Sequence, residues 1–343
     1  MHARARIERE IAAAGGWISF ARYMQLALHE PGVGYYASGA RKFGAGGDFV
    51  TAPELGSLFG RTLARQLGGF ERILEIGAGS GALAGVLADG REYLILETSA
   101  ELIERQRSRL GDRVRHVQQL PVGFRGAVIA NEVVDAIPVQ LVHWSERGIL
   151  ERGVGPGLKW ADRPATGELL AAAEHIHVPA PYVSEIGLAA SAWMRAVAEG
   201  LEQGAIFVID YGFPRHEYYH PQRSSGTLMC HHRHQAHADP FARPGEEDIT
   251  AHVDFSALAE AAQQAGAEVL GYATQAQFLV NCGITEVLAE ANVENALHYA
   301  PIAAEAQKLL SPAEMGELFK VLAVGKGMTS LAAFGRGDRR ASL

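Results

Sequence analysis

The sequence has few cysteines and no excess of positive charge. Its 343 residues include only 2 cysteines, Cys230 and Cys282, which are too few for a disulfide framework and suit a reducing compartment. The 31 Lys and Arg are outnumbered by 39 Asp and Glu, for a formal net charge of −8, and no long basic stripe is present. Because a phosphate backbone is bound by clustered Lys and Arg, nucleic acid is not an expected partner.

The sequence also lacks a long apolar run. No stretch approaches the roughly 20 apolar residues of a membrane helix, so we expect no membrane insertion. The first residues mix Arg with Glu, unlike a signal peptide or an organelle presequence, and we therefore expect a cytoplasmic protein. Hydrophobic residues make up 48% and charged residues 20%, as in ordinary globular proteins. This length allows about two domains or one domain with large insertions.

Short apolar runs alternate with helical stretches from residue 70 onward, which is typical of a doubly wound α/β sheet. The expected strands, in chain order, are 72–76, 93–97, 114–117, 127–130, 205–210, 267–272 and 319–324. The pattern therefore predicts a seven-stranded sheet.

The remaining segments carry weaker signals. Thr51-Ala52-Pro53-Glu54 matches a capping box and predicts a helix that runs through about Leu67. The other expected elements are a β-hairpin within 139–160, one helix over 183–202, and helices within 275–318 that begin at Thr285 and Ser311-Pro312. The stretch 213–250, rich in His, Pro, Arg and Gly, matches no element.

A glycine-rich turn follows the first expected strand and opens a helix. Gly77, Gly79 and Gly81 would let the backbone approach a ligand closely, and exposed amides there attract electronegative atoms. Glu97 ends the second expected strand, where its carboxylate can accept hydrogen bonds from two ribose hydroxyls. Together they predict a pocket for an adenosine-containing ligand at the carboxyl edge of the sheet.

Two adenosine ligands are compatible with this turn. Gly77-x-Gly79-x-x-Ala82 satisfies the looser dinucleotide fingerprint, so an oxidoreductase that uses a dinucleotide is one alternative. Glu75, two residues before the first glycine, favours S-adenosylmethionine instead. Its carboxylate would suit the free amino group of methionine, whereas a pyrophosphate would be repelled by it.

A second polar motif, Asn131-Glu132-Val133-Val134-Asp135, follows the fourth expected strand at the same edge of the sheet. Doubly wound methyltransferases present their acceptor at this place. If the segment is helical, Glu132 and Asp135 share one face, and Asn131 could simply cap the helix. We take Asn131, Glu132 and Asp135 as catalytic candidates, with Asp210 after the fifth strand as a further acid.

A dense group of metal-type side chains lies in the unassigned stretch: Cys230-His231-His232-Arg233-His234, followed by His237. It lacks a second cysteine pair and any familiar zinc spacing, so we expect no metal. These histidines would contact an acceptor or solvent instead.

The chain resembles the MidA family of S-adenosylmethionine-dependent methyltransferases over nearly its full length. Six stretches in order carry the resemblance: HEPGVGYY (29–36), GDFVTAPE (47–54), EIGAGSG (75–81), NEVVDAIP (131–138), IDYG (209–212) and PGEEDITAHVDF (244–255). Mitochondrial members of that family methylate an arginine of a respiratory complex I subunit during assembly. The resemblance implies a protein arginine N-methyltransferase that uses S-adenosyl-L-methionine and acts on a protein substrate of that kind.

The resemblance also implies a class I methyltransferase fold, with the last strand antiparallel between the fifth and sixth. Residues 1–70 would form an N-terminal cap, and 71–343 the methyltransferase domain, with the hairpin 139–160 and the helices 275–318 as insertions. Gly47 and Asp48 would close over the methionine end of the cofactor. The rival interpretation is an assembly or chaperone-like protein that binds the nucleoside without turnover. No pattern indicates an oligomeric state.

Arginine methylation makes a physical demand on the acceptor site. A guanidinium stays protonated and is a poor nucleophile unless carboxylates localise its charge by bidentate pairing. Glu132 and Asp135, with Asp210 as a third acid, would meet this demand. Transfer would then depend mainly on holding nitrogen, methyl carbon and sulfur in line.

Overall fold

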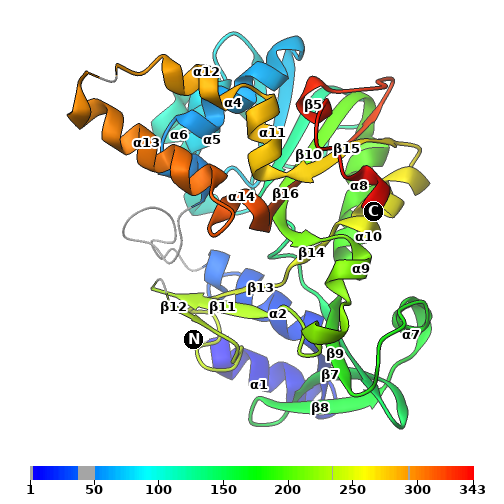
Figure 1. The fold of residues 1–343 in the computed structure, drawn as a ribbon. Helices are drawn as coiled ribbons and strands as arrows, with labels where there is room; N and C mark the ends of the chain where they lie inside the picture. The colour runs from blue at the N-terminus through cyan, green and yellow to red at the C-terminus, as the bar shows by residue number, and fades with distance from the viewer. Residues whose placement is uncertain (1–2, 38–50, 234, 293) are drawn as a thin grey trace.

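The computed structural model describes residues 3–37, 51–233, 235–292 and 294–343 and shows two lobes (Figure 1). The upper lobe in Figure 1 contains the large sheet and the C-terminus, and the lower lobe contains the N-terminal helices and two smaller sheets. Gly47 and Asp48 lie outside the described residues, so their expected place over the cofactor stays a prediction. Within the described ranges, no helix is long and apolar enough to span a bilayer.

The seven apolar runs form the central sheet of the upper lobe. Its order is β15-β16-β10-β5-β2-β3-β4, with the short β14 beside β10, and β16 is antiparallel to both of its neighbours. The strands are β2 (Arg72–Ile76), β3 (Glu92–Leu96), β4 (Arg115–Val117), β5 (Phe124–Asn131), β10 (Leu201–Phe213), β14 (Val253–Asp254), β15 (Glu268–Thr274) and β16 (Phe319–Lys326). This confirms the α/β fold with an antiparallel last strand.

Helices cover both faces of this sheet, which explains why its strands are continuous apolar runs. Phe59 of α4 and Phe278 of α11 are buried on one face, and Met194 of α8 and Phe255 of α10 on the other. The helices of the upper lobe are α3 (Ala52–Leu55), α4 (Leu58–Gln66), α5 (Ala82–Leu87), α6 (Ala100–Leu110), α8 (Leu188–Gly200), α9 (Arg215–Tyr218), α10 (Phe255–Gln264), α11 (Gln275–Asn281), α12 (Ile284–Ala289), α13 (Ala296–Leu310) and α14 (Met315–Leu318).

The lower lobe combines two antiparallel sheets with the N-terminal helices. One sheet has the order β1-β7-β6-β9 with β8 beside β7, and the other has the order β12-β11-β13. Its elements are α1 (Ala3–Ala13), β1 (Ile18–Ser19), α2 (Phe20–His29), β6 (Gln140–Ser145), β7 (Gly148–Gly155), β8 (Lys159–Pro164), α7 (Gly167–Glu174), β9 (Tyr182–Ile186), β11 (Met229–His232), β12 (Gln235–His237) and β13 (Asp248–Thr250). Tyr23 and Met24 of α2 share a core with Cys230 and Ile249. The N-terminal helices therefore pack in the lower lobe, whereas α3 and α4 pack on the large sheet; the division at residue 70 stays a proposal.

Two helix predictions and two predicted helix caps are wrong. The helix expected from Thr51 is interrupted between Leu55 and Leu58, and the Thr51 side chain makes no capping hydrogen bond. The stretch 183–202 is not one helix, because β9 pairs with β6 before α8 begins. Helices α12 and α14 are preceded by Gly283 and Glu314 rather than by the expected Thr and Ser caps. The predicted hairpin is confirmed as β6 and β7.

Candidate cofactor and acceptor site

A pocket of about 900 Å³, which includes solvent space at its mouth, opens at the carboxyl ends of β2, β3 and β5. The chain continues from β2 to β3 on one side and reaches β5 on the other, which is the position where doubly wound sheets bind ligands. The predicted site residues that line it are Glu75, Gly77, Gly79, Glu97, Asn131 and Glu132. The structure thus brings both halves of the predicted site into one cavity.

The turn between β2 and α5 requires glycine for steric reasons. Gly77, Gly79 and Gly81 have φ angles of 68°, 53° and 77°, a region that other residues rarely adopt. A Cβ on Gly77 would lie 2.9 Å from Val133 Cγ2, and one on Gly81 would lie 2.9 Å from Leu110 Cδ1. Gly81 precedes α5 and does not line the pocket. Its role is to let the turn pack against α6.

Gln106 of α6 joins the glycine turn to the tip of β3. Its Nε2 donates to Gly79 O at 2.8 Å and to Glu97 Oε2 at 3.3 Å, and its Oε1 lies 2.8 Å from His116 Nε2. Two backbone amides just beyond β3 donate to Glu97 Oε1 at 2.9 and 3.0 Å. Sequence reasoning missed Gln106, because a glutamine among charged helix residues gives no sign of its complete burial.

Glu75 lies deep in the pocket and is only 4% exposed. The Tyr93 hydroxyl donates to its Oε2 at 2.7 Å. Burial raises the pKa of Glu75 to about 7, and the charge of Glu97 acts in the same direction. A cationic amino group in the pocket would favour the ionised form and pair with it.

Glu132, just beyond β5, also lines the pocket. Its Oε1 accepts hydrogen bonds from Ala52 N and Asn131 Nδ2, both at 3.1 Å. Burial, followed by the charge of Asp135, raises the pKa of Glu132 to about 8. Asn131 Oδ1 is buried and has no hydrogen-bond partner among the described residues, so it can accept one from a bound group.

The segment after Asn131 is not helical, so Glu132 and Asp135 do not share a helical face, and the alternative interpretation of Asn131 as a helix cap is wrong. The segment stays non-helical because Asp210 Oδ2 accepts from the amides of Val134 and Asp135, at 3.0 and 3.3 Å. Asp135 is buried behind the pocket lining, and the Tyr211 hydroxyl donates to it. Burial raises the pKa of Asp135 to about 6, and burial and the neighbouring acids raise the pKa of Asp210 well above its usual range.

The lower lobe contributes an aromatic wall. His29, at the end of α2, and Tyr36, in a short turn at Tyr35–Ala37, line the pocket and stack with ring centroids 5.5 Å apart. The Tyr36 hydroxyl donates to Asp248 Oδ1 at 2.9 Å, and burial lowers the pKa of His29. The site therefore includes both lobes, although sequence reasoning had left His29 without a role.

The residues Thr51 and Glu54 also line the pocket. Glu54 accepts a hydrogen bond from the hydroxyl of Ser80, and Arg109 donates to the same Ser80 oxygen at 2.9 Å. Glu54, which the capping box places at the start of a helix, thus links α3 to the glycine turn through Ser80.

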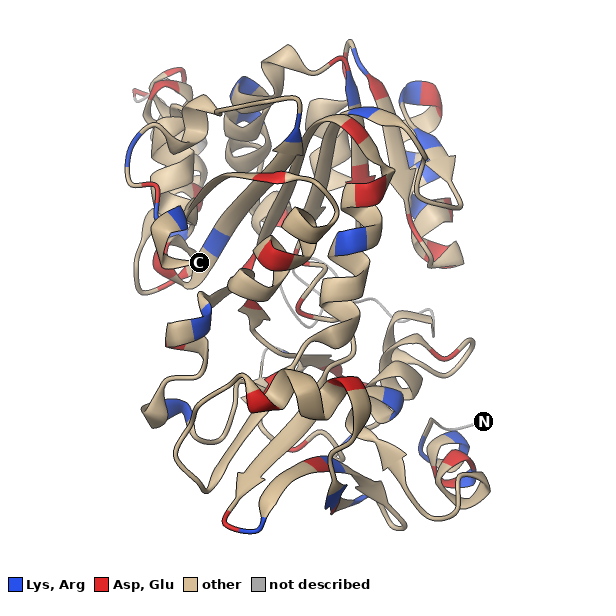
Figure 2. Cartoon of the chain, turned by 90° about the vertical axis from the view of Figure 1, so that its right-hand side faces the viewer, with Lys and Arg blue, Asp and Glu red and all other residues tan. Residues whose placement is uncertain are grey.

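Acidic and basic segments are interspersed over both lobes (Figure 2). The pocket differs from this surface, because its lining contains four acids, Glu54, Glu75, Glu97 and Glu132, and no Lys or Arg among the described residues. Such a lining suits a positively charged ligand and disfavours the pyrophosphate of a dinucleotide.

Comparison with known proteins agrees with these features. Residues 61–273 match a family described as "Putative S-adenosyl-L-methionine-dependent methyltransferase". The chain belongs to this family. The methyltransferase is 50% identical to a Burkholderia thailandensis protein whose crystal structure contains S-adenosyl-homocysteine; the match covers 99% of this chain and 96% of that chain, with a TM-score of 0.95.

Curated relatives of the methyltransferase point in the same direction. The Danio rerio mitochondrial protein arginine methyltransferase NDUFAF7 is 30% identical, over 91% of this chain and 84% of its own length. The Homo sapiens protein of the same name is 27% identical, over 90% of this chain and 80% of its own. The family resemblance and the cofactor inferred from the sequence are thereby confirmed.

The pocket of the methyltransferase fits S-adenosylmethionine. Glu97 would hold the ribose, the turn at Gly77 and Gly79 would place backbone against the nucleoside, and Glu75 would pair with the amino group. When bound, the cofactor supplies an electrophilic methyl group on a sulfonium sulfur. The acidic lining matches that positive charge.

Proposed function

We propose that this methyltransferase modifies an arginine side chain of a protein, of the kind that a respiratory complex I subunit carries. The observation that carries the proposal is the carboxylate of Glu132, which lines the pocket in a poorly solvated position and is fixed by Ala52 N and Asn131 Nδ2. Relatives that match nine-tenths of the chain are named protein arginine methyltransferases, which supports the same acceptor.

A guanidinium is the acceptor that this carboxylate suits best. Its permanent positive charge would stabilise ionised Glu132, and two of its N–H groups can pair with one carboxylate. The buried Asp135 behind Glu132 adds negative potential to the acceptor side. This pairing would draw positive charge away from the nitrogen that receives the methyl group.

Glu132 can also accept the proton that methylation releases. When nitrogen gains a methyl group, one of its protons must leave, and the acceptor of that proton needs a pKa near the working pH. Burial and Asp135 hold the pKa of Glu132 at about 8 in the ligand-free protein, and a bound guanidinium would lower it toward the working pH, where Glu132 is ionised and can accept a proton. We therefore assign Glu132 two roles, pairing with the guanidinium and accepting the proton.

The proposed location is the cytoplasm, because the low cysteine content suits a reducing compartment. The curated relatives are named as mitochondrial proteins, so this proposal concerns the present chain alone.

Glu132→Gln keeps the size of the side chain and removes its charge, so it tests the proposal. With labelled S-adenosylmethionine and a lysate of cells that lack this protein, the parent should label a protein band that contains methylarginine by mass spectrometry. Glu132→Gln should label it at least about 100-fold more slowly, since both pairing and proton acceptance are lost. Its binding of S-adenosylhomocysteine should stay within a few fold of the parent.

Glu104→Gln is the matched control, because Glu104 is exposed on α6 and does not line the pocket. It should label the band as fast as the parent. A band methylated only on another residue type would contradict the arginine proposal. Binding of the nucleoside with no labelled protein in any lysate would favour the non-catalytic assembly protein.

A further inference from the structure

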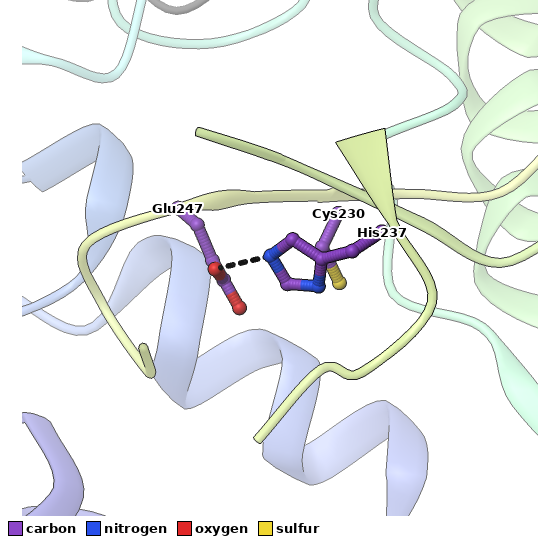
Figure 3. Close-up of side chains that lie close together, drawn as sticks. All are labelled: Cys230, His237 and Glu247. Atoms are coloured by element: carbon purple, nitrogen blue, oxygen red, sulfur yellow. Dashed lines mark hydrogen bonds and ion pairs between the residues drawn. The ribbon is translucent and has the colours of Figure 1, made fainter. Parts of the chain in front are cut away.

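Three metal-type side chains, Cys230, His237 and Glu247, meet in the lower lobe. Figure 3 shows them side by side. Cys230 on β11 lies directly opposite His237 on β12, and Glu247 immediately precedes β13. One ligand atom from each residue lies within 4.8 Å of the other two, and His237 Nε2 is 3.0 Å from Glu247 Oε2. None of the three lines the cofactor pocket.

A bound cation would stabilise the buried acidic groups of this cluster. Cys230 and Glu247 are completely buried, whereas the His237 side chain is 30% exposed. A buried carboxylate is costly unless a cation or several donors compensate it. Glu247 receives a long hydrogen bond from Arg243 N at 3.4 Å and contacts His237, but no Lys or Arg side chain among the described residues forms an ion pair with it.

We propose that Cys230, His237 and Glu247 bind one Zn²⁺ ion. Sulfur, imidazole nitrogen and carboxylate oxygen form a donor set that suits zinc, whereas Ca²⁺ and Mg²⁺ prefer oxygen ligands alone. At the usual bond lengths of about 2.0–2.3 Å, the ligand atoms of a tetrahedral zinc ion lie roughly 3.3–3.8 Å apart. The three ligand atoms here already lie within 4.8 Å of one another, so small side-chain shifts would complete the site. The thiol proton passes to solvent on binding.

The partly exposed His237 leaves a route for the ion and for a water as fourth ligand. The thiolate and the carboxylate together carry two negative charges, which balance the charge of the zinc ion. The site is thus neutral when loaded, which reduces the cost of burying its two acidic groups.

The ion would stabilise the loop between His237 and Glu247. His237 and Glu247 flank the loop 238–246, in which Pro240 O accepts a hydrogen bond from the Tyr23 hydroxyl and Phe241 packs edge-on against the Tyr23 ring, with ring centroids 5.1 Å apart. Zinc would therefore fix this loop against α2. Asp248, next to Glu247, accepts the hydrogen bond from Tyr36 of the pocket, so the ion would also stabilise the aromatic wall.

Sequence spacing could not reveal this site. A standard zinc motif has paired ligands about three to six positions apart, whereas here the ligands are seven and ten positions apart, at 230, 237 and 247. The hairpin of β11 and β12 and the return of the loop to β13 bring them together.

Metal analysis of the full chain tests the proposal. Protein freed of metal by a chelator, then loaded with Zn²⁺ or Co²⁺ and desalted, should retain about one ion per chain by mass spectrometry. The Co²⁺ form should show a thiolate-to-cobalt charge-transfer band. Cys230→Ser should lose both signals, and Zn²⁺ should raise the thermal midpoint of the parent but not of this variant.

Cys282→Ser is the matched control, because Cys282 is also a buried free cysteine but belongs to the core of the large sheet. It should bind metal as the parent does. His237→Gln, at the more exposed ligand, serves as a second variant in case Cys230→Ser does not fold. The proposal would be overturned if the parent bound no stoichiometric metal and showed no cobalt band, or if Cys282→Ser lost metal binding as Cys230→Ser does. Either result would count against the zinc site whether or not the protein binds S-adenosylhomocysteine.

Discussion

At the scale of single residues, the site depends on carboxyl groups that are kept out of water. Burial raises the pKa of Glu75 to about 7 and that of Glu132 to about 8. Among the described residues their hydrogen-bond donors are Tyr93 for Glu75, and Ala52 N and Asn131 for Glu132, with no Lys or Arg side chain. Both can pair with a cationic ligand: Glu75 with the amino group of the cofactor and Glu132, by our proposal, with a guanidinium. Burial of these carboxyl groups disfavours their ionised form, so it should lower the unfolding free energy of the ligand-free protein at pH values where the unfolded chain ionises them.

Stability should fall as the pH rises from 6.5 to 8. In this window the folded protein still holds protons on Glu75 and Glu132, whereas the unfolded chain, with ordinary glutamate pKa values near 4.5, has released them. Below pH 6.5 the lowered pKa values of His29 and His252 act in the opposite sense. Chemical denaturation should show a decrease of the unfolding free energy on the order of 1–2 kcal/mol across the window.

The same titration in Glu132→Gln identifies the group responsible. This variant should show a shallower decrease, because one of the carboxyl groups with a raised pKa is gone, while Glu104→Gln should follow the parent. A stability that is constant or increases from pH 6.5 to 8, or an unchanged slope in Glu132→Gln, would show that these carboxyls are not held in their neutral form.

At the scale of elements, the glycine turn between β2 and α5 needs glycine for two separate reasons. Gly77 has a φ of 68°, which strains any other residue, and a Cβ there would lie 2.9 Å from Val133, which itself lines the pocket. Strain affects stability alone, whereas movement of Val133 also changes the pocket. A matched pair of variants separates the two effects.

Gly77→Ala should cost about 1–2 kcal/mol of stability and weaken S-adenosylhomocysteine binding by at least about tenfold. Gly90→Ala has nearly the same backbone angle, 75°, with nothing within 4 Å of the added Cβ, so it should lose similar stability and keep its affinity. Calorimetry and thermal unfolding of both variants provide the comparison. Equal affinity in the two variants would contradict the role assigned to the turn.

The elements that sequence analysis predicted correctly are those with a strong local signal. A strand such as β16 is buried over nearly its whole length, so its apolar composition alone identifies it. By contrast, β9 was taken for helix, because five mixed residues from Tyr182 fit either period and only the pairing with β6 decides. The three short strands of the β12-β11-β13 sheet are polar and were not recognised.

At the scale of the whole molecule, the site is assembled from both lobes. The cofactor half was predictable, since Glu75, the glycine turn and Glu97 follow directly from strand ends. Tyr36 and Gln106 were not, because their place depends on how the lower lobe and α6 pack. The non-helical course of the segment around Asp135 was not predictable either, because Asp210, which accepts hydrogen bonds from its amides, comes from β10, far away in the sequence.

The central claim is that the acidic pocket at the end of β2 binds the sulfonium nucleoside. The most direct test is calorimetric titration of the full chain with S-adenosylhomocysteine, with NAD⁺ titrated in parallel. We predict one site of micromolar affinity for S-adenosylhomocysteine and no heat with NAD⁺, because the lining has four acids and no basic side chain among the described residues. Absence of S-adenosylhomocysteine binding, or NAD⁺ that competes for the same site, would contradict the account.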